Sequence, residues 1–140
     1  MSKKNIAVLG AGKMGLGIAQ LFATKGHQVK VIYVYDDKIR CDAAAVVRSN
    51  LSVLVENDVM TQQEADDAAA RISFVDTIEE VADFADIVFE GIIEKLEIKQ
   101  DYFAKMDAIF PVSTILATNT SAISITEIAE KSVHKERIIG

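Results

Sequence analysis

Three glycines near the amino terminus have the spacing of a loop that can hold phosphate groups. Gly10, Gly12 and Gly15 stand in the sequence Gly-Ala-Gly-Lys-Met-Gly, directly after the apolar run 5–9. The first glycine permits a tight turn, the missing Cβ of the second lets the backbone approach a pyrophosphate, and the third lets a helix pack closely on a strand. The following helix would offer free N–H groups and the positive end of its dipole to an anion. The pattern predicts a dinucleotide-binding loop; the alternative is a tight turn without a ligand.

A dinucleotide site of this kind usually has an acidic residue about 20 positions further on, which holds the 2′-hydroxyl of a ribose. Counting from Gly15, Tyr33 stands near that position, and Asp36 and Asp37 follow it. Either the second strand is longer and Asp36 takes the role, or Tyr33 replaces the acid. Carboxylates here would repel a 2′-phosphate and favour NAD, whereas Tyr33 leaves NADP open as the cofactor. The two aspartates could also simply cap the next helix.

A lysine falls on the apolar face of a later helix. Lys99 lies on a stripe of apolar residues at helical spacing. These residues are Leu96, Phe103, Met106 and Phe110. A lysine that faces a core is costly unless it is paired or its charged end reaches water. We therefore consider two interpretations: a side chain extended to solvent, or a cation aimed at a cleft and paired with Glu90 or Glu94.

Polar residues follow two of the expected strands at the point where each strand ends. Glu90, Gly91 and Glu94 lie at the end of the run 86–92, and the run 119–121 (Asn-Thr-Ser) follows the strand 113–118. The ligand crevice of an open α/β sheet lies beyond the carboxyl ends of its strands. We expect these groups to converge where a nicotinamide would bind. The alternative for 119–121 is a loop whose hydroxyls cap a helix.

Strand-like and helical patterns alternate along the whole chain. Strands are expected at 5–9, 28–35, 71–75, 86–92, 113–118 and from 137 onward. Helices are expected from 14, at 38–56, from the capping boxes at Thr61 and Thr77, at 94–110 and at 124–131. This order predicts an α/β fold of the Rossmann type. It is a doubly wound, mostly parallel sheet with helices on both faces, formed by a single domain over residues 1–140.

Composition narrows the class of protein. Half of the 140 residues are hydrophobic and the mean hydropathy is +0.21, which is enough apolar material for a packed core. A net charge of −6 makes nucleic acid a poor partner, and no apolar run is long enough to cross a bilayer. One cysteine, Cys41, excludes an internal disulfide and a cysteine metal site, and no metal motif is present. We expect a cytoplasmic domain in which His27 and His134 are exposed.

Four segments carry a family resemblance: 6–29, 50–72, 85–107 and 114–129. With the glycine loop, the Glu-x4-Lys spacing and the Ala-Thr-Asn-Thr-Ser run, the chain resembles the N-terminal, NAD-binding domain of the 3-hydroxyacyl-CoA dehydrogenases. The resemblance implies an oxidoreductase of fatty acid and butanoate metabolism. Such an enzyme reversibly oxidises an (S)-3-hydroxyacyl-CoA, here expected to be 3-hydroxybutyryl-CoA, to the 3-oxoacyl-CoA by hydride transfer to NAD.

The resemblance also implies roles for individual residues. Glu94 and Lys99 contact the cofactor, Asn119 lies near the nicotinamide, and the hydroxyl of Ser121 bonds the substrate oxygen. Asn119 and Ser121 are therefore the expected catalytic residues. The expected cofactor contacts are Gly10, Gly12, Lys13, Met14, Gly15, Tyr33, Asp36, Glu90, Glu94, Lys99 and Asn119.

The chain departs from the family pattern in two places. The family's ribose-binding Asp falls at Tyr33 or Val34, which puts the preference for NAD in doubt. The family's catalytic His follows the last strand in a His-Phe-Phe-Asn-Pro run, and neither that run nor the C-terminal substrate and dimerisation domain is present in these 140 residues. His134 precedes the strand and is no substitute. We expect this chain alone to be inactive or nearly so.

Two other functions are consistent with the same residues. The chain could be a stand-alone nucleotide-binding or regulatory module without chemistry of its own, or another Rossmann-type binder such as a methyltransferase. In either case the last strand and its neighbouring apolar surface would be exposed, so self-association into a homo-oligomer is expected.

Overall fold

The computed structural model describes residues 3–40 and 42–140, and these residues form one sheet of six parallel strands. Cys41, the single cysteine of the sequence, lies outside the described residues. The strand order is β3-β2-β1-β4-β5-β6, so the direction of winding reverses between β1 and β4. The strands are β1 Asn5–Leu9, β2 Gln28–Ile32, β3 Ile72–Val75, β4 Ile87–Glu90, β5 Ile115–Thr118 and β6 Ile138–Ile139.

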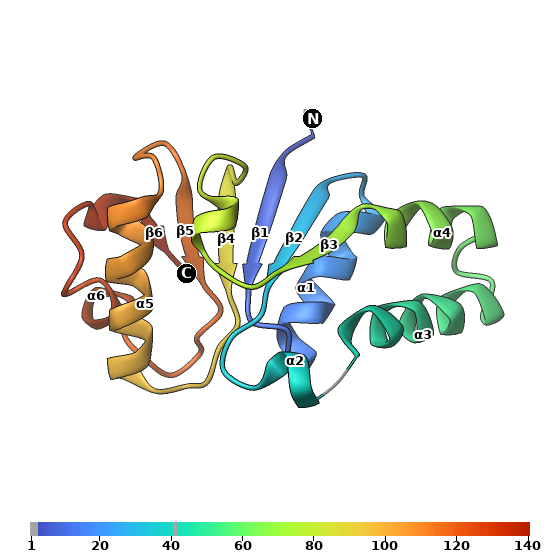
Figure 1. The fold of residues 1–140 in the computed structure, drawn as a ribbon, viewed down its shortest axis with the longest axis horizontal. Helices are drawn as coiled ribbons and strands as arrows, with labels where there is room; N and C mark the ends of the chain where they lie inside the picture. The colour runs from blue at the N-terminus through green and yellow to red at the C-terminus, as the bar shows by residue number, and fades with distance from the viewer. Residues whose placement is uncertain (1–2, 41) are drawn as a thin grey trace.

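Helices cover both faces of the sheet and also extend beyond one edge of it. They are α1 Lys13–Thr24, α2 Asp37–Arg40, α3 Ala43–Glu56, α4 Gln62–Ala70, α5 Leu96–Ile109 and α6 Ile125–Ile128, with short 3-10 helices at Glu79–Val81 and Lys135–Arg137. Figure 1 shows α5 and α6 beside β5 and β6 at one end, and α3 and α4 extending past β3 at the other. The expected doubly wound α/β fold is confirmed.

Successive residues of β1 supply two separate cores because side chains of a strand alternate between the faces of its sheet. Ala7 and Leu9 pack in one core with Phe103 of α5. Ile6 and Val8 pack in the other core, which is formed with residues of α1, α3 and α4. These four residues are at most 1% exposed. Burial on both faces explains why the run 5–9 is continuously apolar rather than alternating.

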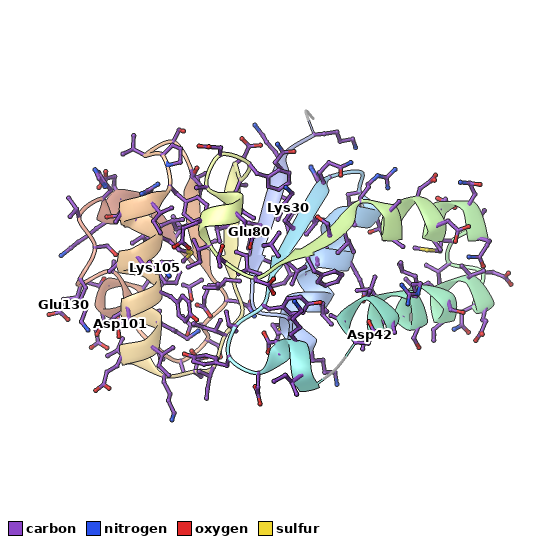
Figure 2. All side chains as sticks on the ribbon, viewed as in Figure 1. Lys30, Asp42, Glu80, Asp101, Lys105 and Glu130 are labelled. Atoms are coloured by element: carbon purple, nitrogen blue, oxygen red, sulfur yellow. The ribbon has the colours of Figure 1, made fainter. Side chains whose placement is uncertain are left out.

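The segment from β2 to α3 differs most from the sequence expectation. The second strand ends at Ile32 rather than at 35, and the expected helix 38–56 is divided into α2 and α3. The division has a local cause. Asp42, which Figure 2 labels beside the start of α3, caps this helix. Its side chain accepts a hydrogen bond from the N–H of Ala45 at 3.1 Å. Aspartate favours this position because its carboxylate satisfies an N–H that has no partner within the helix.

The two expected capping boxes have different outcomes. Thr61 and Glu64 form both reciprocal hydrogen bonds at the start of α4. At Thr77 only half of the box forms: Glu80 accepts from the N–H of Thr77 at 2.8 Å, but the Thr77 hydroxyl donates to Glu80 instead of accepting from its backbone. The helix that follows is accordingly one short 3-10 turn, Glu79–Val81.

His27 is buried, and the expectation that it is a solvated loop residue is wrong. Its side chain is 5% exposed. Nδ1 accepts a hydrogen bond from the N–H of Lys4 at 2.9 Å, and the ring meets that of Phe22 edge-on with centroids 5.7 Å apart. The turn between α1 and β2 therefore packs beneath the amino end of the sheet.

A buried ion pair joins α5 to the segment before β6. Arg137 and Asp107 approach to 2.7 Å, with side-chain exposures of 6% and 3%. The guanidinium also donates to the carbonyls of Asp107, Phe110, Pro111 and Thr114. A buried charge is tolerated only when it is paired and hydrogen-bonded in this way. The pair holds the amino-terminal end of β5 and β6 against α5.

This ion pair makes stability depend on pH. Burial raises the pKa of Asp107, but hydrogen bonds from His134, Arg137 and Val133 outweigh burial and lower the pKa from 3.8 to about 2. Because the folded-state pKa is the lower one, the carboxylate stabilises the fold above pH 3.8 and loses this effect as the pH falls toward 2. We expect urea unfolding to show that the free energy of unfolding of the unchanged chain falls by roughly 2 kcal/mol more over this pH range than that of the Asp107→Asn variant.

Asp101→Asn is the control, because Asp101 pairs with Lys131 on the surface and its side chain is 71% exposed. Its pH profile should follow that of the unchanged chain. Equal acid sensitivity of the Asp107→Asn variant and the unchanged chain would contradict the assignment.

Candidate functional site

The glycine loop has the geometry that its sequence predicts. Gly10 has φ +109°, and a Cβ there would lie 2.9 Å from the carbonyl oxygen of Gly91. A Cβ on Gly15 would lie 2.1 Å from the carbonyl oxygen of Gly10. A Cβ on Gly12, by contrast, would meet no atom within 4 Å. Gly10 and Gly15 are thus required by the fold, while Gly12 borders open space that a ligand could fill.

The amino end of α1 opens toward the same space. Gly12 is the N-cap of α1, and no side chain of the described residues makes a capping hydrogen bond there. Lys13 and Met14 form the first turn and are exposed. N–H groups at a helix start, together with the helix dipole, form a favourable site for an anion such as a pyrophosphate.

A cavity of about 520 Å³ lies beyond the carboxyl ends of β1, β2 and β4. It is therefore located where the strand order reverses, which is the position of ligand sites in doubly wound sheets. Its wall is formed by the glycine loop, the turn after β2, the loop after β4 and one residue of α5. The lining residues are Gly10, Gly12, Lys13, Met14, Val34, Tyr35, Asp36, Asp37, Gly91, Ile92, Ile93 and Ile98.

The residues considered for the ribose are divided by the structure. Asp36 lines the cavity and is exposed. Tyr33 does not line it: its ring stacks on that of Phe74, with centroids 5.6 Å apart and planes 19° apart, and packs against the core on the α1 side. Tyr33 therefore occupies the sequence position of the expected acid, but its ring contributes to packing.

On the other side of β4, a closed set of polar contacts joins the ends of two strands to α5. We call its five residues the polar ring: Glu90, Glu94, Lys99, Thr118 and Thr120. One Glu90 carboxylate oxygen accepts from Lys99 Nζ at 2.5 Å, and the other accepts from Thr118 Oγ1 at 2.5 Å. Lys99 Nζ lies 3.3 Å from Glu94 Oε1, which also accepts from Thr120 Oγ1 at 2.7 Å. The N–H of Thr120 donates to Thr118 Oγ1 at 3.3 Å and closes the ring.

The polar ring decides between the two interpretations of Lys99. The Lys99 side chain is 2% exposed and the Glu90 side chain 0%, so the lysine does not extend to solvent. It is paired with both of the expected acids. Taking two charges out of water is costly, and the short charge-assisted bonds around Glu90 offset that cost. A hydrogen bond from Thr120 lowers the pKa of Glu94, and Lys99 adds to this effect against the opposing effect of burial.

The loop that follows β5 is fixed by the same residues. The N–H of Asn119 donates to the carbonyl of Glu90 at 3.1 Å, and Thr120 Oγ1 accepts from the N–H of Ile123 at 3.1 Å. Asn119 and Ser121 are themselves exposed. Both side chains are therefore carried on a loop whose backbone is held from beneath by the polar ring.

Sequence reasoning missed the part played by Thr118. The residue was counted only as the end of a strand, since threonine is common in strands. The signal that could have identified it is its pairing with Glu90: both are the last residues of neighbouring parallel strands, and the register places them side by side.

The described residues contain no group of three or more His, Cys, Asp or Glu side chains that could hold a metal ion. Among the same residues, no helix is both long enough and apolar enough to cross a membrane.

The parallel sheet, the glycine turn into α1 and the cavity at the reversal of strand order define a Rossmann-type dinucleotide-binding domain. Residues 5–140 match the family described as "3-hydroxyacyl-CoA dehydrogenase, NAD binding domain". The chain belongs to this family, as its sequence resemblance predicted.

Individual relatives agree with this assignment. A probable 3-hydroxybutyryl-CoA dehydrogenase of Bacillus subtilis (strain 168) is 41% identical over 142 residues, covering 100% of this chain and 48% of that protein. A 3-hydroxybutyryl-CoA dehydrogenase of Bradyrhizobium diazoefficiens is 35% identical, covering 98% and 46%. The crystal structure of 3-hydroxybutyryl-CoA dehydrogenase from Escherichia coli K12 superposes with a TM-score of 0.89 at 34% identity, covering 99% of this chain and 29% of that one. This chain thus spans about half or less of the length of these relatives.

The polar ring leads to a prediction about stability. Thr118→Val keeps the side-chain shape but removes a hydroxyl that donates to a buried carboxylate. We expect a loss of about 2–3 kcal/mol in the free energy of unfolding, because a buried charged group loses a partner. Thr118→Ser, which keeps the hydroxyl, should recover most of it in urea unfolding.

Thr114→Val is the matched control. Thr114 is equally buried, but its hydroxyl donates to a neutral carbonyl, that of Ala85, at 3.0 Å. Its loss should be smaller, about 1 kcal/mol. Equal losses at Thr114 and Thr118 would show that the charge on Glu90 is of no consequence.

Proposed function

We propose that this chain is the NAD(H)-binding part of a 3-hydroxyacyl-CoA dehydrogenase. The observation that carries the proposal is the cavity at the reversal of strand order, bordered by the glycine loop and by the uncapped amino end of α1. Gly12 fits this cofactor because it leaves open space in which a pyrophosphate can approach the backbone. Membership of the family supports the same cofactor.

The residues divide the cofactor site into two halves. Backbone N–H groups of the first turn of α1, at Lys13 and Met14, would hold the pyrophosphate, and the turn 34–37 would border the adenosine. The loop that begins at Asn119 would border the nicotinamide. When bound, the nicotinamide ring accepts or donates the hydride of the reaction.

The polar ring would keep the nicotinamide half in shape rather than take part in the chemistry. Glu90 is fully buried, so we assign it a positioning role through Lys99 and the backbone of Asn119. Glu94 has a side chain that is 44% exposed and can reach a cofactor directly. The hydroxyl of Ser121, exposed on the same loop, can donate a hydrogen bond to the 3-oxygen of a substrate.

We propose NAD rather than NADP as the cofactor. Asp36 is exposed on the cavity wall at the turn after β2, and a carboxylate at this place would repel a 2′-phosphate. Lys38, the first cation after this turn in the sequence, pairs with Asp76 at 3.1 Å.

A 3-hydroxyacyl-CoA, with 3-hydroxybutyryl-CoA as the first candidate, is the proposed substrate of the whole enzyme. The names of the Bacillus and Bradyrhizobium relatives support that acyl group, while an Escherichia coli relative that is 36% identical is named 3-hydroxyadipyl-CoA dehydrogenase.

We also propose that copies associate through the edge at β6, where Ile125 and Ile139 are 38% and 46% exposed.

Gly12→Ala tests the cofactor site without disturbing the fold. A Cβ at Gly12 meets no protein atom within 4 Å and the backbone there has φ −78°, which alanine adopts freely. The methyl group would instead occupy space proposed for the pyrophosphate. We expect calorimetric titration to show NADH binding at least about tenfold weaker, with an unchanged melting temperature.

Gly17→Ala is the matched control, because Gly17 also has no atom within 4 Å of an added Cβ but lies within α1, away from the cavity wall. It should stabilise the fold by about 0.5–1 kcal/mol and leave NADH affinity unchanged. If both variants bind NADH as the unchanged chain does, the pyrophosphate does not lie at Gly12. If the unchanged chain binds no NADH, the proposed function fails.

Catalysis is predicted to be weak in the isolated chain. The family resemblance assigns the general base to a His within a His-Phe-Phe-Asn-Pro run that these 140 residues do not contain. A positioned base contributes about 10²–10⁴-fold to a rate. We expect NADH oxidation with acetoacetyl-CoA, followed by absorbance, to be slower than in a two-domain enzyme by at least this factor. Rapid turnover by the pure chain would contradict the need for that base.

The alternative of a regulatory module without chemistry predicts NADH binding as well. It differs in two measurements: NADH binding to such a module would be insensitive to acetoacetyl-CoA, and the module would show no turnover that Ser121→Ala could reduce. A measurable loss of residual turnover in Ser121→Ala would favour the dehydrogenase.

A further inference from the structure

We propose that Asp37 is a positioning residue that holds the adenosine half of the cofactor cavity in its binding shape. This inference rests on the proposed function. Asp37 begins α2 and is 3% exposed. Its Oδ2 atom accepts two backbone hydrogen bonds, from the N–H of Ala11 at 2.9 Å and from the N–H of Val34 at 3.0 Å.

These two bonds connect opposite walls of the cavity. Ala11 lies between Gly10 and Gly12 in the glycine loop, whereas Val34 belongs to the turn after β2. A single carboxylate oxygen therefore links two segments that α1 and β2 separate in the sequence, and it adds to the bond that the N–H of Gly10 donates to the carbonyl of Ile32 at 2.9 Å. Ionised acceptors make shorter and stronger hydrogen bonds than neutral ones, so this link is well suited to fix the spacing of the two walls.

The same carboxylate closes a turn in an unfavourable conformation. Tyr35 has φ +51°, a left-handed value that is disfavoured for a residue with a side chain. The N–H of Asp37 donates to the carbonyl of Val34 at 3.1 Å, and the N–H of Val34 donates back to the Asp37 side chain. Held in this way, the 63% exposed Tyr35 lines the cavity and meets Tyr102 of α5 edge-on, with centroids 6.3 Å apart. Strain of this kind persists only where the surroundings enforce it.

The direction of these bonds separates the tasks of two neighbouring aspartates. The Oδ2 atom of Asp37 already accepts hydrogen bonds from the backbone of Ala11 and Val34, so we assign this oxygen to the protein rather than to a ligand. Asp36 is exposed on the cavity wall and is the carboxylate placed to meet a ribose. Asp37 should therefore set the affinity for every adenosine-containing ligand, and Asp36 should set the preference for NADH over NADPH.

The test is calorimetric titration of the whole chain and three variants with AMP, NADH and NADPH, at a temperature well below each melting temperature. Asp37→Asn should weaken AMP and NADH by the same factor, about tenfold, and leave the ratio of NADH to NADPH affinity unchanged. Asp36→Asn should lower that ratio. Asp67→Asn, on the exposed face of α4, should change neither quantity.

Two outcomes for Asp37→Asn overturn the inference. If Asp37→Asn has a lower melting temperature but wild-type affinities, Asp37 supports the fold alone. If it raises NADPH affinity relative to NADH, Asp37 is itself the ribose ligand. Should Asp37→Asn not fold, Asp37→Glu keeps the charge but displaces it by one methylene, and the same uniform loss is expected. If the unchanged chain binds no NADH, the proposed function fails first and the positioning role fails with it.

Discussion

The fully buried carboxylate of Glu90 is the group on which the rest of the site depends. It stands at the carboxyl end of β4, between the glycine loop on one side and the end of β5 on the other. A charge in that place requires hydrogen-bond partners, and these are Lys99 of α5 and Thr118 of β5. The next residue, Gly91, is where the backbone of the glycine loop makes its close approach at Gly10. One electrostatic requirement therefore fixes α5 and the end of β5 against the strand that borders the glycine loop.

Much of this arrangement can be predicted from the sequence because it depends on local rules. The glycine spacing, the Thr61 capping box and the continuous apolar run of β1 each predict one local backbone geometry, and each has the expected structure. The interruption of an apolar stripe by Lys99 left two interpretations open, and the structure has the paired, buried lysine. These signals are strong because a misplaced glycine, cap or charge has a direct energetic cost.

The remainder depends on partners that are distant in the chain. Tyr33 could be read as a substitute for an acid, and only the stacking on Phe74 of β3 shows that its ring contributes to packing. Asp37 resembles an ordinary helix cap until its bond to Ala11 is seen. Arg137 stands in a charged, surface-like segment, yet it is buried against Asp107. In each case the local sequence permits two roles, and the tertiary contact selects one.

The order of the strands has a consequence for how the site forms during folding. β1 pairs with β2, which follows it closely in sequence, but also with β4, some eighty residues later; Asn5 already bonds Asp86 across a separation of 81 residues. Contacts between such distant segments form slowly because closing a long loop costs chain entropy first. As the chain leaves the ribosome, the glycine loop is synthesised before β4, so the cavity wall that follows β4 forms later. The first half of the molecule can therefore be structured well before it is able to hold a ligand.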